Sequence, residues 1–275
     1  MDNYKITKAV YASNAENIEL WLAEARFGFS HLKEFIPSLR SNSDILEVGC
    51  GSGILLSMLA EEYSEYNFVG IEPFSSGFSS LKELNAIVRK LGVSLYIERY
   101  EEHQSKYDLI YCVNVFEHVE DWRHLIDWAS NNLKEDGRFL VLCPNYGFPY
   151  ESHFKIPIIY NKVLTYKVFK RYILNFEKNN KCYGLWDSLN FVKKREIMKF
   201  CKDNTEKNGL NISDDISVID DMIERLSKDV EFSKRQSLIG KIANLMKAVG
   251  VIKLIKKFKN HIPYMKICFR KTSKF

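Results

Sequence analysis

The stretch DILEVGCGSGILLSML, residues 44–59, joins two apolar segments through a run that contains three glycines. The glycines are Gly49, Gly51 and Gly53; a strand-like apolar pattern precedes them and a helix-like pattern follows. Glycine adopts positive φ angles and lets a ligand approach bare backbone. The amides at the start of the next helix can then point at that ligand. The stretch therefore predicts a strand, a ligand-binding turn and a helix.

The following segments repeat this alternation of apolar strands and amphipathic helices. Strands are expected at 44–49, 67–72, 94–98, 107–115 and 137–145, and helices at 54–63, around 78–91 and at 122–133. Such alternation is typical of a parallel sheet covered by helices on both faces. The predicted fold class is α/β, with a doubly wound, mostly parallel, seven-stranded sheet.

The rhythm changes beyond Pro144, where the composition of residues 146–161 predicts a loop. The expected elements beyond it are helices at 161–177 and 193–207, a sixth strand at 210–215, inserted helices within 216–260, and a seventh strand at 263–271, antiparallel at the sheet edge or beside it. We expect three regions: an N-terminal helical cover (1–40), a ligand-binding core (41–146) and a third region (147–275) with a helical insertion and closing strands. In the cover, Ser13 and Glu16 have the spacing of a capping box before an amphipathic helix.

Length, charge and cysteine content limit the class of protein to which this chain can belong. The chain has 275 residues and a formal net charge of +5. Its six cysteines form no CxxC or zinc-site spacing, which favours reduced thiols and a cytoplasmic location. No apolar run has the length of a membrane span, and no signal peptide is expected. Residues 1–150 are acidic and the remainder basic, with no acidic residue after Glu231. The basic half is either a solvated surface or a surface for an anionic partner.

A carboxylate completes the pattern around the glycines. Their spacing is GxGxG rather than the GxGxxG that binds a dinucleotide pyrophosphate. Glu72 ends the second apolar strand, where a carboxylate in doubly wound folds accepts hydrogen bonds from both ribose hydroxyls. A solvated strand end is the alternative reading of Glu72.

The segments LEVGCGSG, VGIEP, YDLIYCVNVFEHVED and LKEDGRFLVLCPN together resemble class I S-adenosylmethionine (SAM)-dependent methyltransferases. They are most similar to the small-molecule branch that includes ubiquinone-biosynthesis O-methyltransferases, and the resemblance covers residues 40–146. It implies SAM as cofactor and a Rossmann-like methyltransferase fold. It also implies that the cofactor is bound by Glu47, Gly49, Cys50, Gly51, Gly53, Glu72, Pro73, Tyr100, Glu101, Asn114 and Val115. Tyr100 departs from the family, which often has Asp there.

Two histidines are candidate catalysts. His118 follows the fourth strand, and His153 lies in the loop after the fifth, so both are expected at the carboxyl edge of the sheet. Histidine titrates near neutrality, which suits a base that removes the acceptor's proton. The alternatives are a loop-ordering role for His118 and a solvated surface for His153. No catalytic metal is predicted, because Asn114 stands where some relatives have a carboxylate ligand and only Glu117 and His118 remain.

The C-terminal half is expected to determine the acceptor. Within 241–259, apolar residues on one helical side and lysines on the other predict either packing on the sheet or peripheral contact with an anionic membrane. The preferred function is O-methylation of a small-molecule or glycan acceptor, phosphorylated or lipid-linked. Methylation of protein or RNA, and a non-catalytic SAM-binding protein at a membrane, are the alternatives. Nucleic acid is the less favoured partner because no recognised binding module is present.

Overall fold

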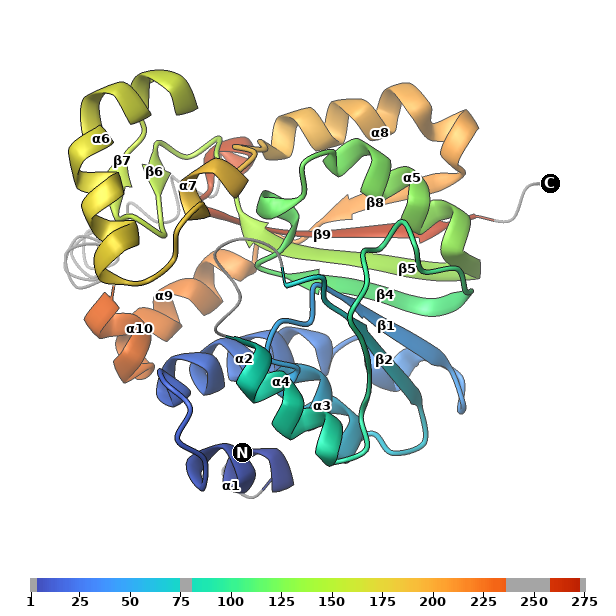
Figure 1. Cartoon of the computed structure of the whole chain (residues 1–275). Helices are drawn as coiled ribbons and strands as arrows, with labels where there is room; N and C mark the ends of the chain where they lie inside the picture. Colours follow the sequence, from blue (N-terminus) through green and yellow to red (C-terminus); the bar gives the residue numbers. More distant parts are fainter. Residues whose placement is uncertain (1–3, 75–80, 236–257, 273–275) are drawn as a thin grey trace.

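A computed structural model describes residues 4–74, 81–235 and 258–272. Its main sheet has seven strands in the order β3-β2-β1-β4-β5-β9-β8 (Figure 1). The strands are β1 (Asp44–Val48), β2 (Asn67–Ile71), β3 (Ser94–Tyr96), β4 (Tyr107–Val113), β5 (Leu133–Pro144), β8 (Leu210–Asp214) and β9 (Tyr264–Lys271). The predicted doubly wound fold is confirmed.

The strand order places a crevice beside β1. The chain runs outward from β1 through β2 to β3, then returns to the other side of β1 for β4 and β5. These five strands are parallel, whereas β9 lies antiparallel between β5 and β8. The seventh strand therefore lies beside the edge rather than at it. In such sheets, ligands bind outside the carboxyl ends of the strands where the order reverses, here between β1 and β4.

Helices cover both faces of the sheet, as its strands are apolar on both sides (Figure 1). One face carries α1 (Lys5–Tyr11), α2 (Ile18–Leu32), α3 (Ile54–Glu62), α4 (Lys82–Lys90) and α9 (Val218–Lys228). The other carries α5 (Trp122–Asn132) and α8 (Lys194–Asn208). Short 3-10 turns occur at η1 (Ile36–Ser38), η3 (Phe116–His118) and η4 (Lys259–His261).

The capping box at Ser13 and Glu16 is a wrong prediction. Helix α2 begins at Ile18, and its N-cap residue Asn17 makes no side-chain capping bond. The Ser13 hydroxyl instead donates to the carbonyl of Val10 at 2.7 Å, so it closes the turn after α1. The spacing did not reveal that a separate helix, α1, ends immediately before Ser13.

The segment between β5 and α8 forms a lobe beside the sheet (Figure 1). It contains a hairpin of β6 (Tyr150–Glu151) and β7 (Ile156–Pro157), then α6 (Lys162–Asn179) and α7 (Leu185–Ser188). The lobe has its own apolar core around Phe154 and Trp186. The expected loop at 146–161 thus contains a hairpin, while the helices expected at 161–177 and 193–207 are confirmed as α6 and α8.

Two further features bear on the sequence predictions. Helices α9 and α10 (Val230–Arg235) lie between β8 and β9, where inserted helices were expected; the amphipathic pattern of 241–259 lies almost wholly outside the described residues. All six cysteines are free thiols.

Among the helices that the structure describes, none combines the length and the apolar character needed to cross a bilayer.

Candidate functional site

The glycine turn after β1 has a backbone conformation that favours glycine. Gly49 has a φ of +71°, and a Cβ built there would lie 2.5 Å from Cγ1 of Val115. Gly51 has a φ of +50°. Side chains are strained at such angles, and a side chain at Gly49 would also overlap Val115. Glycine therefore allows the turn at the carboxyl end of β1 to pack closely against Val115.

Glu72 faces this turn from the end of β2. One carboxylate oxygen accepts the Gly51 amide proton at 3.0 Å and the other accepts that of Phe74 at 2.7 Å. Burial raises the pKa of Glu72, and the two backbone donors partly offset this. Each carboxylate oxygen can accept two hydrogen bonds, so both retain capacity for a ligand hydroxyl.

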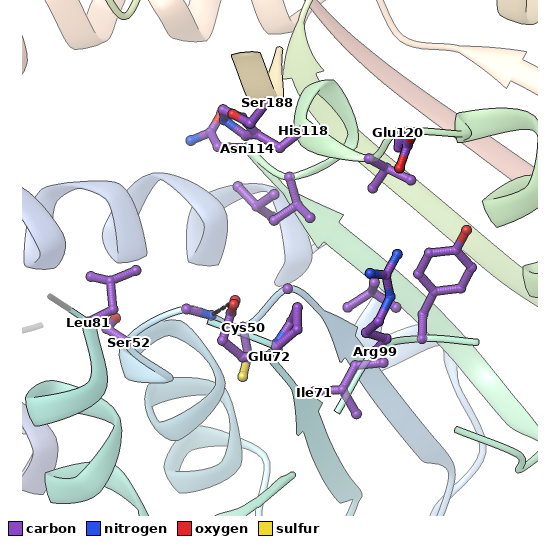
Figure 2. Close-up of a pocket in the computed structure, with 18 of the residues that line it drawn as sticks. Cys50, Ser52, Ile71, Glu72, Leu81, Arg99, Asn114, His118, Glu120 and Ser188 are labelled. Carbon is purple, nitrogen blue, oxygen red and sulfur yellow. Dashed lines mark hydrogen bonds between the residues drawn. The ribbon is translucent and has the colours of Figure 1, made fainter. Parts of the chain in front are cut away.

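A cavity of about 810 Å³ lies over the turn. That volume is in the upper part of the range for small-molecule sites, about 300–1,000 Å³. Nine predicted site residues line it: Gly49, Cys50, Gly51, Glu72, Pro73, Tyr100, Glu101, Asn114 and Val115. His118 lines it as well. Figure 2 shows Cys50 and Glu72 in one part of this cavity and Asn114, His118 and Ser188 in another.

Glu47, Gly53 and His153 are not among the lining residues. The Glu47 carboxylate is buried beneath the turn and accepts a hydrogen bond from the Tyr111 hydroxyl at 3.1 Å. Burial raises its pKa to about 8; the Tyr111 bond lowers it and the charge of Glu72 raises it further. Gly53 is the N-cap of α3. Neither residue lines the cavity, and their contact with the cofactor stays a prediction.

Asn114 is fixed by partners from distant parts of the chain. It follows β4 with a φ of +55°. Its amide nitrogen donates to Glu24 at 3.2 Å, and its amide oxygen accepts the Tyr264 hydroxyl proton at 2.7 Å. Glu24 in turn pairs with Arg225 of α9, with 3.1 Å between Oε1 and Nη2. The end of β4 is therefore held between α2, α9 and β9.

A second wall of the cavity comes from the loop after β3. The Tyr100 hydroxyl lies 2.9 Å from Nδ1 of His124 on α5. Arg99 pairs with Glu101, with 3.3 Å between Nε and Oε2. Among the described residues that line the cavity, Arg99 is the one basic side chain other than histidine. Seven lining residues are acidic: Glu24, Glu72, Glu98, Glu101, Glu120, Asp121 and Asp187. The lining therefore suits a cationic ligand better than an anionic one.

His118 stands on the cavity wall and meets the lobe. Its Nδ1 lies 2.9 Å from the Ser188 hydroxyl. That hydroxyl donates its proton to the carbonyl of Leu185 at 2.7 Å, so Nδ1 of His118 is the donor and Nε2 carries no proton. Burial, with the neighbouring His153 and Lys162, holds the pKa of His118 well below its usual range. The ring is uncharged at neutral pH.

His153 lies behind His118, and the two rings are T-shaped with centroids 5.2 Å apart. Nδ1 of His153 is 2.7 Å from Oε1 of the buried Glu151. Burial raises the pKa of Glu151, but His153 and the backbone donors outweigh it and the net pKa is lowered. The structure therefore brings together the two histidines that the sequence singled out, and only one of them reaches the cavity.

Several lining residues were not predicted. Trp21 and Glu24 come from α2, and Ser188 and Asn190 from the lobe. The Asn190 amide donates to the carbonyls of Phe116 at 2.7 Å and Val119 at 2.9 Å, which ties the lobe to the His118 turn. The predicted helical cover at 1–40 was the one sequence signal near Trp21 and Glu24. No sequence pattern pointed to the lobe residues.

A family model described as a methyltransferase domain matches residues 21–172, more than half of the chain. The fold and the glycine turn described above are those of this class. The chain therefore belongs to the SAM-dependent methyltransferase family, whose cofactor is SAM.

Two relatives differ in how much of this chain they match. An uncharacterised protein of Mycobacterium tuberculosis H37Rv is 32% identical over 221 residues, which cover 78% of this chain and 73% of the relative. The ubiquinone biosynthesis O-methyltransferase of Hydrogenovibrio crunogenus is 31% identical over 139 residues, which cover 46% of this chain and 56% of that protein.

Among solved structures, phosphoethanolamine N-methyltransferase 2 of Haemonchus contortus with bound SAM has a similar fold. The TM-score is 0.53 at 14% identity, and the match covers 90% of this chain and 52% of that one. The chain thus spans about half the length of that enzyme, and the likeness concerns the fold alone.

Proposed function

We propose that the chain transfers the methyl group of SAM to a hydroxyl oxygen of a small-molecule or glycan acceptor. The observation that supports this most is a single cavity whose wall carries both the glycine turn with Glu72 and the neutral imidazole of His118. One part suits a nucleoside, and the other suits a group that must lose a proton.

The donor would lie across the turn between Gly49 and Gly51, with its ribose hydroxyls donating to Glu72. Cys50, Pro73, Tyr100, Glu101, Asn114 and Val115 would complete its contacts, and contacts with Glu47 and Gly53 stay a prediction. Bound SAM supplies a methyl group already activated by a sulfonium charge. The acidic lining would stabilise that positive charge on the bound donor. The protein's task is then mainly to align the acceptor and exclude water.

The acceptor would enter beside His118, Ser188 and Asn190. As its oxygen bonds to the methyl carbon, the electrons of the carbon–sulfur bond pass to sulfur. The hydroxyl proton must leave, and the neutral imidazole of His118, which lines this wall, would receive it. His153 would hold the His118 ring in place by edge contact. His118→Ala and His153→Ala should both lower turnover, and full activity in both would remove this assignment.

The charges that line the cavity limit what the acceptor can carry into it. The described lining offers no cluster of lysines, so a phosphate or lipid pyrophosphate on the acceptor would have to lie outside it. We also propose that the protein is cytoplasmic and that residues 241–259 would carry any contact with an anionic membrane. Sedimentation with phosphatidylglycerol vesicles tests the contact: binding above that to phosphatidylcholine vesicles supports it, and equal binding removes it.

Transfer of a labelled methyl group separates this function from its alternatives. The wild type is incubated with labelled SAM and with small-molecule, lipid-extract, RNA and protein fractions; Gly51→Arg, which fills the turn, is the control. Label in the small-molecule or lipid-extract fraction supports the proposal. Label confined to RNA or protein contradicts it, and SAM binding without label in any fraction indicates a non-catalytic protein.

A further inference from the structure

Three metal-ligating side chains meet behind the wall of the cavity. Oε1 of Glu117 lies 3.9 Å from Nε2 of His118 and 3.9 Å from Nε2 of His153. One ligand atom from each residue lies within 4.8 Å of the others. Ligand atoms around a zinc ion, each about 2.0–2.2 Å from it, stand roughly 3.3–3.6 Å apart. The two carboxylate–imidazole distances exceed that spacing by only about half an ångström.

The Glu117 carboxylate has a clear need for a partner. Its side chain is fully buried. Within the described part of the chain, neither of its oxygens has a hydrogen-bond partner. A buried polar group without a bond costs about 1–3 kcal/mol, and more when it is charged. Natural proteins rarely leave such a group unsatisfied, and a bound ion is one recognised partner for it.

Both imidazoles are oriented from behind in the manner of metal ligands. Nδ1 of His118 donates to the Ser188 hydroxyl at 2.9 Å, and Nδ1 of His153 bonds Oε1 of Glu151 at 2.7 Å. Glu151 is itself fixed by the backbone amides of His153 and Phe154, at 3.1 and 2.6 Å. Metal-bound histidines characteristically donate their second N–H to such a carboxylate, carbonyl or other acceptor, which directs the remaining nitrogen at the ion. Here both Nε2 atoms point towards Glu117.

We propose that Glu117, His118 and His153 bind one divalent transition-metal ion, with at least one coordination position left for water or an acceptor oxygen. Two imidazoles and a carboxylate favour zinc, manganese, iron or cobalt over magnesium, which prefers oxygen ligands. The sequence alone counted too few ligands, because His153 reaches the cluster only through the folding of the lobe.

The role of the ion rests on the proposed function, whereas its binding does not. His118 is the one member of the trio that lines the cavity, so we place the open coordination position of the ion on that side, where an acceptor hydroxyl would occupy it. A bound hydroxyl loses its proton more readily, as water does on zinc. His118 would then act as a metal ligand. The ion, rather than the imidazole, would promote loss of the acceptor's hydroxyl proton.

Direct metal titration tests the site. The full-length protein is treated with a chelator, the chelator is removed, and Co²⁺ is added while its visible absorption bands are followed; Zn²⁺ is titrated in parallel by calorimetry. We expect one equivalent of each ion to bind and Mg²⁺ to bind far more weakly. Glu151→Gln should weaken binding about 10–100-fold as an outer partner, and Glu117→Gln and His153→Gln should weaken it more.

His103→Gln is the matched control, because His103 also pairs with a glutamate, Glu98, but has no second imidazole ligand. It should bind metal like the wild type. Failure of the folded wild type to take up an equivalent of Co²⁺ or Zn²⁺ would overturn the proposal. So would unchanged affinity in folded His153→Gln, whose side chain is 22% exposed and replaceable without burying a charge. Calorimetry with SAM on the same samples shows separately whether the transferase proposal holds.

Discussion

Gly49 shows why the turn after β1 requires glycine. Its φ of +71° disfavours any side chain, and the Val115 methyl groups occupy the place of a Cβ at 2.5 and 2.6 Å. Gly92 has a φ of +86° with no heavy atom within 4 Å of a built Cβ. The two glycines therefore separate the effect of backbone strain from that of a steric clash.

Gly49→Ala should destabilise the protein more than Gly92→Ala does. A left-handed conformation costs a non-glycine residue about 1–2 kcal/mol, and only Gly49→Ala adds the clash with Val115. Urea unfolding measures both variants. Adding Val115→Ala to Gly49→Ala should recover part of the loss. Equal destabilisation of the two single variants would show that the turn is not tightly packed.

Glu47 makes stability depend on pH. Its pKa is raised to about 8 from an ordinary value of 4.5, chiefly by burial, so the folded chain binds this proton more tightly than the unfolded chain does. The resulting stability is fully present below pH 4.5 and is lost as the pH rises through about 8. Glu47→Gln, whose amide oxygen can still accept the Tyr111 bond, should flatten this dependence. Thermal melts at pH 5 and pH 9 without cofactor measure it; an unchanged slope contradicts the burial account.

At the scale of elements, the sequence predicted the sheet far better than the lobe. Most of β4 and the second half of β5 are apolar runs, and that pattern has one physical meaning when helices alternate with them. Helix α1 and the β6–β7 hairpin are too short to carry a periodic signal. Ser188 and Asn190 reach the site only because α7 folds back onto the His118 turn, which no local pattern encodes.

Trp186 should hold that lobe together. It is buried and contacts Phe154 and Phe191 with ring centroids 5.5 and 5.4 Å away. Trp186→Ala should cost about 3–5 kcal/mol and loosen the Ser188–His118 contact, while SAM affinity changes little. Hydrogen exchange across 150–190 and SAM calorimetry measure these effects. Tyr160→Ala, at an aromatic that is 87% exposed, is the control; protection of the lobe as in the wild type after Trp186→Ala would contradict its role.

At the scale of the whole molecule, residues from both ends of the chain converge on the crevice beside β1. Glu24 of α2 joins Asn114 at the end of β4 to Arg225 of α9, and Tyr264 of β9 completes the network. We assign the donor to the cavity residues of the first half of the sheet and the acceptor to those of the lobe. Sequence reasoning pointed to residues at strand ends because their pattern is local, whereas Ser188 and Asn190 reach the cavity through tertiary contacts.

Calorimetric titration of SAM into the wild type and Glu72→Ala tests the central claim most directly. Glu83→Ala, at a glutamate on α4 outside the cavity lining, is the control. One SAM should bind per chain, and Glu72→Ala should weaken binding about 10–100-fold, because hydrogen bonds to a charged group contribute about 1.5–3 kcal/mol. Glu83→Ala should match the wild type. Absence of SAM binding, or equal affinity in all three proteins, would contradict the placement of the donor across the glycine turn.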